Sequence, residues 1–237
     1  MIDINCDMGE GMGNEELLMP FINSANIACG YHAGDETTMQ RVIELCLKHN
    51  VNIGAHPSFL DRVNFGRTEM QLPASAIYQL VTEQLELINK IALRWGGKLH
   101  HIKPHGALYN MAAKDAVLAK AIAQAVKDFD ASLIYYGLSG SVMIMEAARL
   151  GLQTANEVFA DRTYQPDGTL TPRSLPNALL SNTDDAVKQA IKFVKENKVV
   201  TGTGEEIIVK ADTICIHGDG KNAVKFAKAI YQQLHEK

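Results

Sequence analysis

Short apolar runs alternate with amphipathic segments along the whole chain, a pattern typical of a parallel sheet covered by helices. Each run is short enough to be a strand, and turn-forming or polar residues follow it. These runs predict seven strands: Ile2–Cys6, Ser24–Cys29, Val51–Ala55, Leu99–Lys103, Ser132–Tyr136, Leu152–Glu157 and Thr213–Ile216.

Apolar residues at helical spacing fill most of the stretches between these strands. Pro73 is expected to open a helix that Gly96–Gly97 ends, with a buried face running from Ile77 to Trp95. Asp35 is expected to cap a helix that buries Met39, Val42, Ile43, Cys46 and Leu47. Three further helical patterns are Leu118, Ile122 and Val126; Val187, Ile191 and Val194; and Val224, Ala227, Ile230 and Leu234. Repeated strand–helix units predict the α/β class and one domain over residues 1–237.

Two segments interrupt this rhythm. Residues Phe159 to Asn182 contain three prolines in a connection far longer than usual, which predicts either a functional lid or a poorly ordered excursion. Residues Val199–Val209 carry two glycines between apolar ends and predict a small hairpin.

Charge and composition exclude several classes of protein. The chain has 23 Lys and Arg against 27 Asp and Glu, a net charge of −4, so no basic surface for nucleic acid or anionic membranes is expected. Cys6, Cys29, Cys46 and Cys215 form no C-x-x-C pair, which favours reduced thiols. The acidic N-terminal sequence does not fit a secretion signal. We therefore expect a soluble, cytoplasmic protein.

Candidate chemistry collects where the predicted strands end, which is where barrel and open α/β folds carry their sites. Five of the eight histidines lie within a few residues of such an end. We leave His101 out of the site, and we interpret Asp35 as a helix cap. The strand-end candidates are Asn5, Asp7, Glu10, His32, His56, Asp61, Arg67, Lys103, His105, Glu157, Asp161, Arg162, His217 and Asp219.

Two kinds of ligand site are weaker expectations. Asp7, His32 and His56 are the candidate set for a divalent metal, but no ligand spacing supports it, and we favour acid–base work by the same groups. Glycine-rich turns at 9–13, 137–140 and 218–221 can offer backbone N–H groups to an anion. No P-loop occurs in the chain.

The motifs resemble, as an ordered set, those of the LamB/YcsF family. They are DINCDMGEG at Asp3–Gly11, ACGYHAGD at Ala28–Asp35, GAHPSFLDRVNFGR at Gly54–Arg67, KPHGALYN at Lys103–Asn110, EVFADRTY at Glu157–Tyr164 and CIHGD at Cys215–Asp219. The resemblance implies a seven-stranded parallel β/α barrel similar to that of polysaccharide deacetylases. It also implies the A subunit of an ATP-dependent 5-oxoprolinase, which opens 5-oxoproline to L-glutamate together with B and C subunits.

This activity gives the strand-end residues expected roles, with ATP and Mg²⁺ as cofactors. Lys103, taken as an exposed lysine, is expected to neutralise phosphoryl oxygens, and Arg67 or Arg162 to bind the substrate carboxylate. The expected catalytic residues are Asp7, Glu10, His56, Lys103, His105 and His217, and the expected substrate-binding residues are Asn5, Arg67, Arg162 and Asp219.

Two other functions remain open at this point. One is a stand-alone metal-dependent hydrolase of N-acyl sugars, and the other is a non-catalytic carrier of a small carboxylate. Fold analogy alone does not separate these functions.

Overall fold

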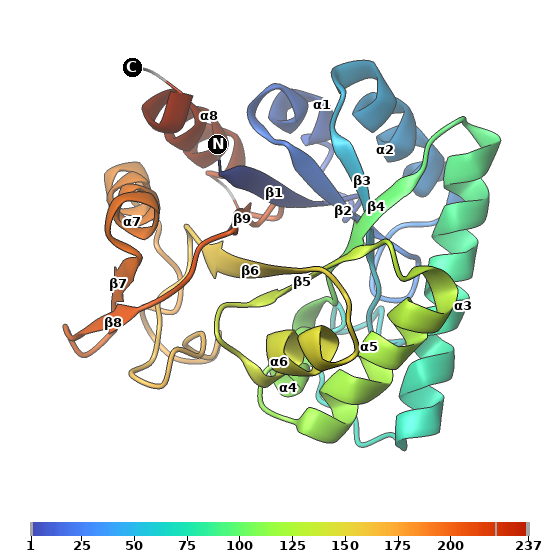
Figure 1. The fold of residues 1–237 in the computed structure, drawn as a ribbon. Helices are drawn as coiled ribbons and strands as arrows, with labels where there is room; N and C mark the ends of the chain where they lie inside the picture. The colour runs from blue at the N-terminus through green and yellow to red at the C-terminus, as the bar shows by residue number, and fades with distance from the viewer. Residues whose placement is uncertain (1, 221, 236–237) are drawn as a thin grey trace.

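The computed structural model describes residues 2–220 and 222–235, and its centre is a closed barrel of seven parallel strands (Figure 1). The strands follow one another around the barrel in chain order, and β9 closes it by pairing with β1. The predicted fold class is confirmed. The barrel strands are β1 (Asp3–Met8), β2 (Ser24–Ala28), β3 (Asn52–His56), β4 (Leu99–Ile102), β5 (Ile134–Leu138), β6 (Thr154–Phe159) and β9 (Thr213–Ile216).

Three strands end later than the sequence predicted. β1, β5 and β6 reach Met8, Leu138 and Phe159, so Asp7 and Glu157 lie within strands and do not follow them. Polar residues suggested strand ends because they are uncommon in buried strands. Here the barrel interior accepts them, because it is itself polar.

Side chains alternate between this polar interior and an apolar shell under the helices. Asn26 donates to Asn5 Oδ1 (2.7 Å) and to Asp7 Oδ1 (2.8 Å), while Asn5 donates to Thr213 Oγ1 (2.7 Å). His101 Nε2 donates to Asn26 Oδ1 at 2.8 Å. This network satisfies buried polar groups along the barrel axis and explains why His101, which shares a face with Lys103, is a core residue.

Helices cover the outside of the barrel (Figure 1). They are α1 (Glu15–Leu18), the 3-10 helix η1 (Met19–Phe21), α2 (Glu36–His49), α3 (Ala74–Arg94), α4 (Gly106–Ala112), α5 (Ala116–Asp130), α6 (Val142–Arg149), α7 (Thr183–Glu196) and α8 (Ala223–His235). The predicted cap of α2 is confirmed, because Asp35 Oδ1 accepts from the backbone N–H of Thr38 at 2.8 Å. Pro73 and Gly96 bracket α3 as predicted.

Parts of the predicted helix faces are wrong. Leu47 lies at the edge of the apolar stripe of α2 and Trp95 follows the last residue of α3, and both side chains are exposed. In α7 the buried residues are Ala186, Ala190 and Phe193, each one position before a residue of the predicted face. Val194 is exposed. The aromatic ring of Phe193 fills more space than a valine, which selects the buried face.

The predicted hairpin is confirmed as the antiparallel pair β7 (Lys198–Val200) and β8 (Glu206–Ile208), which lies to one side of the barrel beside α7 (Figure 1). The long segment after β6 folds back on itself through the bridges Arg162–Leu179 and Tyr164–Leu170. Tyr164 is buried, and its hydroxyl accepts from the backbone N–H of Phe159 at 2.8 Å. This segment is therefore an ordered wall of the molecule.

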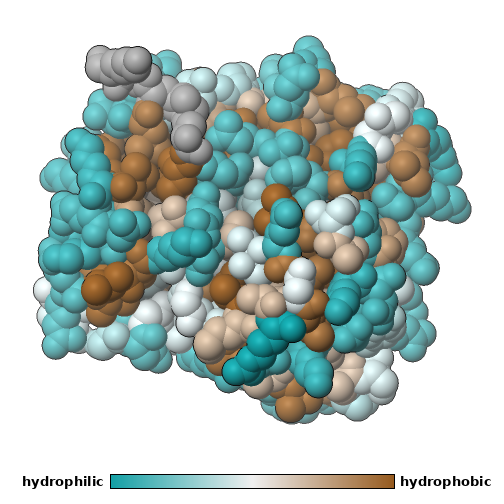
Figure 2. All heavy atoms as spheres, in the orientation of Figure 1, coloured by the Kyte–Doolittle hydropathy of each residue, from teal (hydrophilic) through white to brown (hydrophobic). Residues whose placement is uncertain are grey.

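The face shown in Figure 2 is mostly hydrophilic, with hydrophobic side chains in separate small groups. Among the described residues, no helix is both long enough and apolar enough to span a membrane. The four cysteines are free and buried, in agreement with the expected reduced thiols.

Candidate functional site

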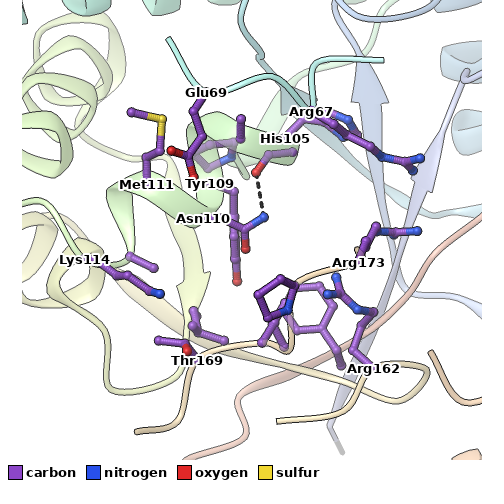
Figure 3. Close-up of a pocket in the computed structure, with 18 of the residues that line it drawn as sticks. Arg67, Glu69, His105, Tyr109, Asn110, Met111, Lys114, Arg162, Thr169 and Arg173 are labelled. Carbon is purple, nitrogen blue, oxygen red and sulfur yellow. Dashed lines mark hydrogen bonds between the residues drawn. The ribbon is translucent and has the colours of Figure 1, made fainter. Parts of the chain in front are cut away.

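A cavity of about 610 Å³ opens where the barrel strands end, on the side predicted for the site. Asp7, His56, Lys103, His105 and His217 reach it from β1, β3, β9 and the residues that follow β4. Figure 3 shows Arg67, Arg162 and Arg173 on one side of the cavity and Lys114 on another. The remaining wall includes Glu69, Tyr109, Asn110, Met111 and the segment Thr169–Ser174.

Lys103 is buried at the base of this cavity, and the expectation of an exposed lysine is wrong. Its Nζ lies 2.8 Å from Asp7 Oδ1, 2.9 Å from Glu157 Oε1 and 3.0 Å from Cys215 Sγ. The other oxygen of Glu157 accepts from the hydroxyl of Tyr109 at 2.7 Å. The ammonium group is thus a structural counter-ion as well as a charge at the site.

This pairing fixes the charge state of both partners. Burial by itself would raise the pKa of Asp7, but Lys103 and His56 outweigh it and hold that pKa well below its usual value. Burial would lower the pKa of Lys103, but Asp7, Cys215 and Glu157 raise it well above its usual value. Asp7 is therefore a carboxylate and Lys103 an ammonium ion at neutral pH.

A second group, which we call the histidine–glutamate cluster, consists of Glu10, His32, His56 and His105. One ligand atom from each residue lies within 4.8 Å of all the others. Burial, followed by the charge of Asp7, raises the pKa of Glu10 well above its usual value. Burial also lowers the pKa of His32 to about 2 and that of His105 well below its usual value, so both rings are neutral.

The metal candidates expected from the sequence are divided between these two groups. His32 and His56 belong to the cluster, whereas Asp7 Oδ1 is paired with Lys103 and its Oδ2 lies 3.5 Å from His56 Nε2. Glu10 supplies the carboxylate of the cluster, and His105 supplies a third imidazole. The residues that together could hold a metal ion are therefore Glu10, His32, His56 and His105.

His217 forms a separate pair with Asp161. Asp161 accepts from His217 Nδ1 at 2.9 and 3.0 Å and from the backbone N–H of His217 at 3.1 Å. The ring of His217 stacks on Phe159, and the residue lines the cavity. A carboxylate that holds one imidazole nitrogen leaves the other free for proton transfer.

The predicted substrate-binding residues differ in their surroundings. Arg67 lines the cavity, but Asp219 pairs with it at 2.7 Å and does not itself line the cavity. Arg162 lines the cavity while it donates to the carbonyl oxygens of Ala178 and Thr171. Asn5 is fully buried below the cavity, so it positions Lys103 and Asn26 and does not reach a ligand.

Two of the three glycine turns behave differently from the anion cradle considered above. In the turn at 137–140, the N–H of Ser139 donates to Glu157 O and that of Gly140 to Asn156 Oδ1. Those donors are already used. In the turn at 218–221, Gly220 N donates to His217 O, and Lys221 lies outside the described residues.

Sequence reasoning did not select several cavity residues. Glu157 was noted at a strand end but was not chosen, and Tyr109, Lys114 and Arg173 were not noted. Arg173 has no ion pair with any residue in the described part of the chain. Its position in a long, proline-rich connection was the available signal, since such segments carry binding residues.

The fold and the site define a β/α-barrel protein with a buried ionisable site at the carboxyl ends of its strands. The sequence matches the LamB/YcsF family over residues 2–237, and the chain belongs to this family. This confirms the resemblance that its ordered motifs indicated.

Relatives share most of their length with this chain. It is 51% identical to the protein of Oceanobacillus iheyensis named as the A subunit of 5-oxoprolinase, over 98% of this chain and 93% of that protein. It is 52% identical to the protein of the same name from Tolumonas auensis, over 98% and 95%. The structure of a lactam utilization protein from Thermus thermophilus superposes with a TM-score of 0.92 at 39% identity, covering 98% of this chain and 95% of that chain.

A more distant structure is similar in fold alone. The family 4 carbohydrate esterase of Streptomyces lividans has a TM-score of 0.54 at 12% identity, covering 98% of this chain and 86% of that chain. It shares the barrel architecture, and at this identity nothing about its activity transfers.

Proposed function

We propose that this chain is the A subunit of an ATP-dependent 5-oxoprolinase and acts in opening the lactam of 5-oxo-L-proline to L-glutamate. The observation that carries the proposal is the identity of about 50% with proteins named as the A subunit of 5-oxoprolinase, over nearly their full length. The cavity supports it, because about 610 Å³ is the size of a small-molecule site and its base carries buried charged groups.

The wall of the cavity suits a substrate with a carboxylate. Arg162 is held rigidly by two backbone carbonyl groups, and Arg173 has no ion pair among the residues described here. A guanidinium group binds a carboxylate through two parallel hydrogen bonds. We therefore assign carboxylate binding to Arg162 and Arg173, with Arg67 held in a pair with Asp219 beside them.

The base of the cavity suits the chemistry of a stable amide. Phosphorylation of the lactam oxygen by ATP makes the ring carbon easier for water to attack, and it places negative charge near the site. Lys103 stabilises that charge, and Asp7 holds the lysine in place. His217, oriented by Asp161, is the proton carrier, and Glu10, His56 and His105 complete the set of acid–base groups.

ATP with Mg²⁺ and the subunits B and C belong to the same proposal. The chain has no P-loop, which favours an ATP site that is shared with or supplied by the partner subunits. Cytoplasmic location follows from the proposed use of intracellular ATP, and one domain accounts for the barrel and its side hairpin.

The test is glutamate formation from 5-oxoproline and ATP, measured with the chain alone, with B and C subunits alone, and with all three. We expect turnover only in the complete mixture. Full turnover by the single chain contradicts the need for partners, and no glutamate from the complete mixture contradicts the function.

The same preparation tests the two other functions. A stand-alone deacetylase releases acetate from N-acetyl sugars without partners, and we expect none. A carrier binds 5-oxoproline but can be replaced by added substrate, so B and C subunits at high 5-oxoproline concentration would then turn over without this chain.

A further inference from the structure

The histidine–glutamate cluster contains two imidazole rings whose lone pairs face each other. His56 Nδ1 lies 2.7 Å from the carbonyl oxygen of Lys103, and His105 Nε2 lies 2.9 Å from that of Phe65. A carbonyl oxygen only accepts, so these two nitrogens carry the ring hydrogens. The remaining nitrogens, His56 Nε2 and His105 Nδ1, lie 2.9 Å apart with no hydrogen left to share between neutral rings. A cation must lie between them.

Two further ligand atoms surround the same position. Glu10 Oε1 is 3.1 Å from His32 Nε2, 3.3 Å from His105 Nδ1 and 3.9 Å from His56 Nε2. Ligand atoms at about 2.0–2.2 Å from a tetrahedral zinc ion are separated by roughly 3.3–3.6 Å. The separations in the cluster bracket this range, so a small inward or outward adjustment brings all four atoms to bonding distance of one ion.

The surrounding chain holds the rings in place. His32 stacks on His105 with ring centroids 3.8 Å apart, and Phe65 packs edge-on against both rings. Phe65 has a φ of +58°, a conformation that costs energy for a bulky residue and that directs its carbonyl oxygen to His105. A hydrogen bond from the outer nitrogen of a ligating histidine to a carbonyl is a common feature of metal sites.

The position of the cluster gives an ion access from two sides. His56 and His105 line the large cavity, whereas Glu10 and His32 line a second cavity of about 350 Å³ bounded by Gly9, Gly34 and Arg62. An ion can therefore enter from the smaller cavity and face a ligand in the larger one.

We propose that Glu10, His32, His56 and His105 bind one divalent transition-metal ion of the zinc type. Three imidazole nitrogens and one carboxylate oxygen suit zinc, cobalt or nickel better than Mg²⁺ or Ca²⁺, which prefer oxygen ligands. The site is therefore distinct from the Mg²⁺ that accompanies ATP.

The other group of metal-ligating residues at the barrel mouth does not compete. Asp7, Cys215 and His217 also lie close together, but the ammonium group of Lys103 lies 2.8 Å from Asp7 and 3.0 Å from Cys215. That position already has its cation. The role of the transition-metal ion in turnover, as a Lewis acid beside the lactam, rests on the proposed function, but its binding does not.

The test is metal binding by the full chain without substrate. The protein is stripped with a chelator and titrated with Co²⁺, which absorbs visible light when bound to nitrogen ligands, and its zinc content after Zn²⁺ loading is measured by elemental analysis. We expect one ion per chain. Glu10→Gln and His32→Gln should each weaken binding about 100-fold or more, since even the outer partners of metal ligands are worth roughly 10- to 100-fold.

His217→Gln is the matched control, because His217 lies at the same barrel mouth outside the cluster, and it should bind metal like the wild type. Thermal melts of every variant separate loss of ligand from loss of fold. Wild-type protein that binds neither Co²⁺ nor Zn²⁺ would show that a proton is the cation between His56 and His105, and would overturn the proposal. Binding that survives in Glu10→Gln but is lost in His217→Gln would also overturn it. Neither outcome alters the glutamate assay, so the two proposals fail separately.

Discussion

Lys103 and Glu157 form a salt bridge inside the barrel, with Nζ 2.9 Å from Oε1 and side chains that are 3% and 0% exposed. They come from neighbouring parts of the mouth, after β4 and within β6. Asp7 contacts the same ammonium group from β1. One lysine therefore neutralises two buried carboxylates, and its removal affects folding as well as chemistry.

Lys103→Met should lower the free energy of unfolding by about 3–5 kcal/mol, because it leaves Asp7 and Glu157 buried without their counter-ion. Urea unfolding monitored by circular dichroism measures the change. Lys48→Met is the control, since Lys48 pairs with Glu16 at an exposed position and such pairs contribute at most about 1 kcal/mol. Equal stabilities for the two variants would contradict the structural role of Lys103.

His217→Gln should lower kcat of the complete enzyme by roughly 10²- to 10⁴-fold, the range of general acid–base groups. Asp161→Asn should lower kcat less, because it disturbs only the orientation of the ring. Residues that act as one unit are not additive. The double variant should therefore be no slower than His217→Gln, and a double variant whose loss equals the product of the two single losses would separate the residues.

Arg173→Met should raise KM for 5-oxoproline by about 10- to 100-fold with kcat little changed, because a charged hydrogen bond is worth about 1.5–3 kcal/mol. Steady-state kinetics of the complete enzyme measure both constants. Arg149→Met is the control, as Arg149 is an exposed residue of α6 paired with Glu146. An unchanged KM in Arg173→Met would exclude Arg173 from the substrate site.

Gly66→Ala should destabilise the protein more than Gly11→Ala, by about 1–3 kcal/mol. Both glycines have positive φ, so both variants carry backbone strain. A methyl group at Gly66 would lie 2.2 Å from Ser58 Oγ and 2.9 Å from His32 Cβ, whereas nothing lies within 4 Å at Gly11. Thermal or urea unfolding compares the two, and equal losses would show that crowding around His32 is unimportant.

Much of the fold could be predicted from the sequence. Strand and helix patterns are local, because each depends on the spacing of apolar residues within a few turns or pleats. All seven barrel strands, the cap at Asp35 and the hairpin after α7 follow from such patterns. The order of strand–helix units also determined which end of the sheet would carry the site, since that end is common to all parallel strands.

Pairing within the site was decided by the tertiary structure. The sequence placed Asp7, Glu10, His32, His56 and Lys103 near strand ends, but it could not show which carboxylate meets the lysine and which meets the histidines. Barrel closure brings β1 beside β9 and Glu157 within reach of Lys103, and the turn after β1 directs Glu10 toward His32. These contacts join residues far apart in the chain, so they depend on strand register and side-chain direction, which no local pattern encodes.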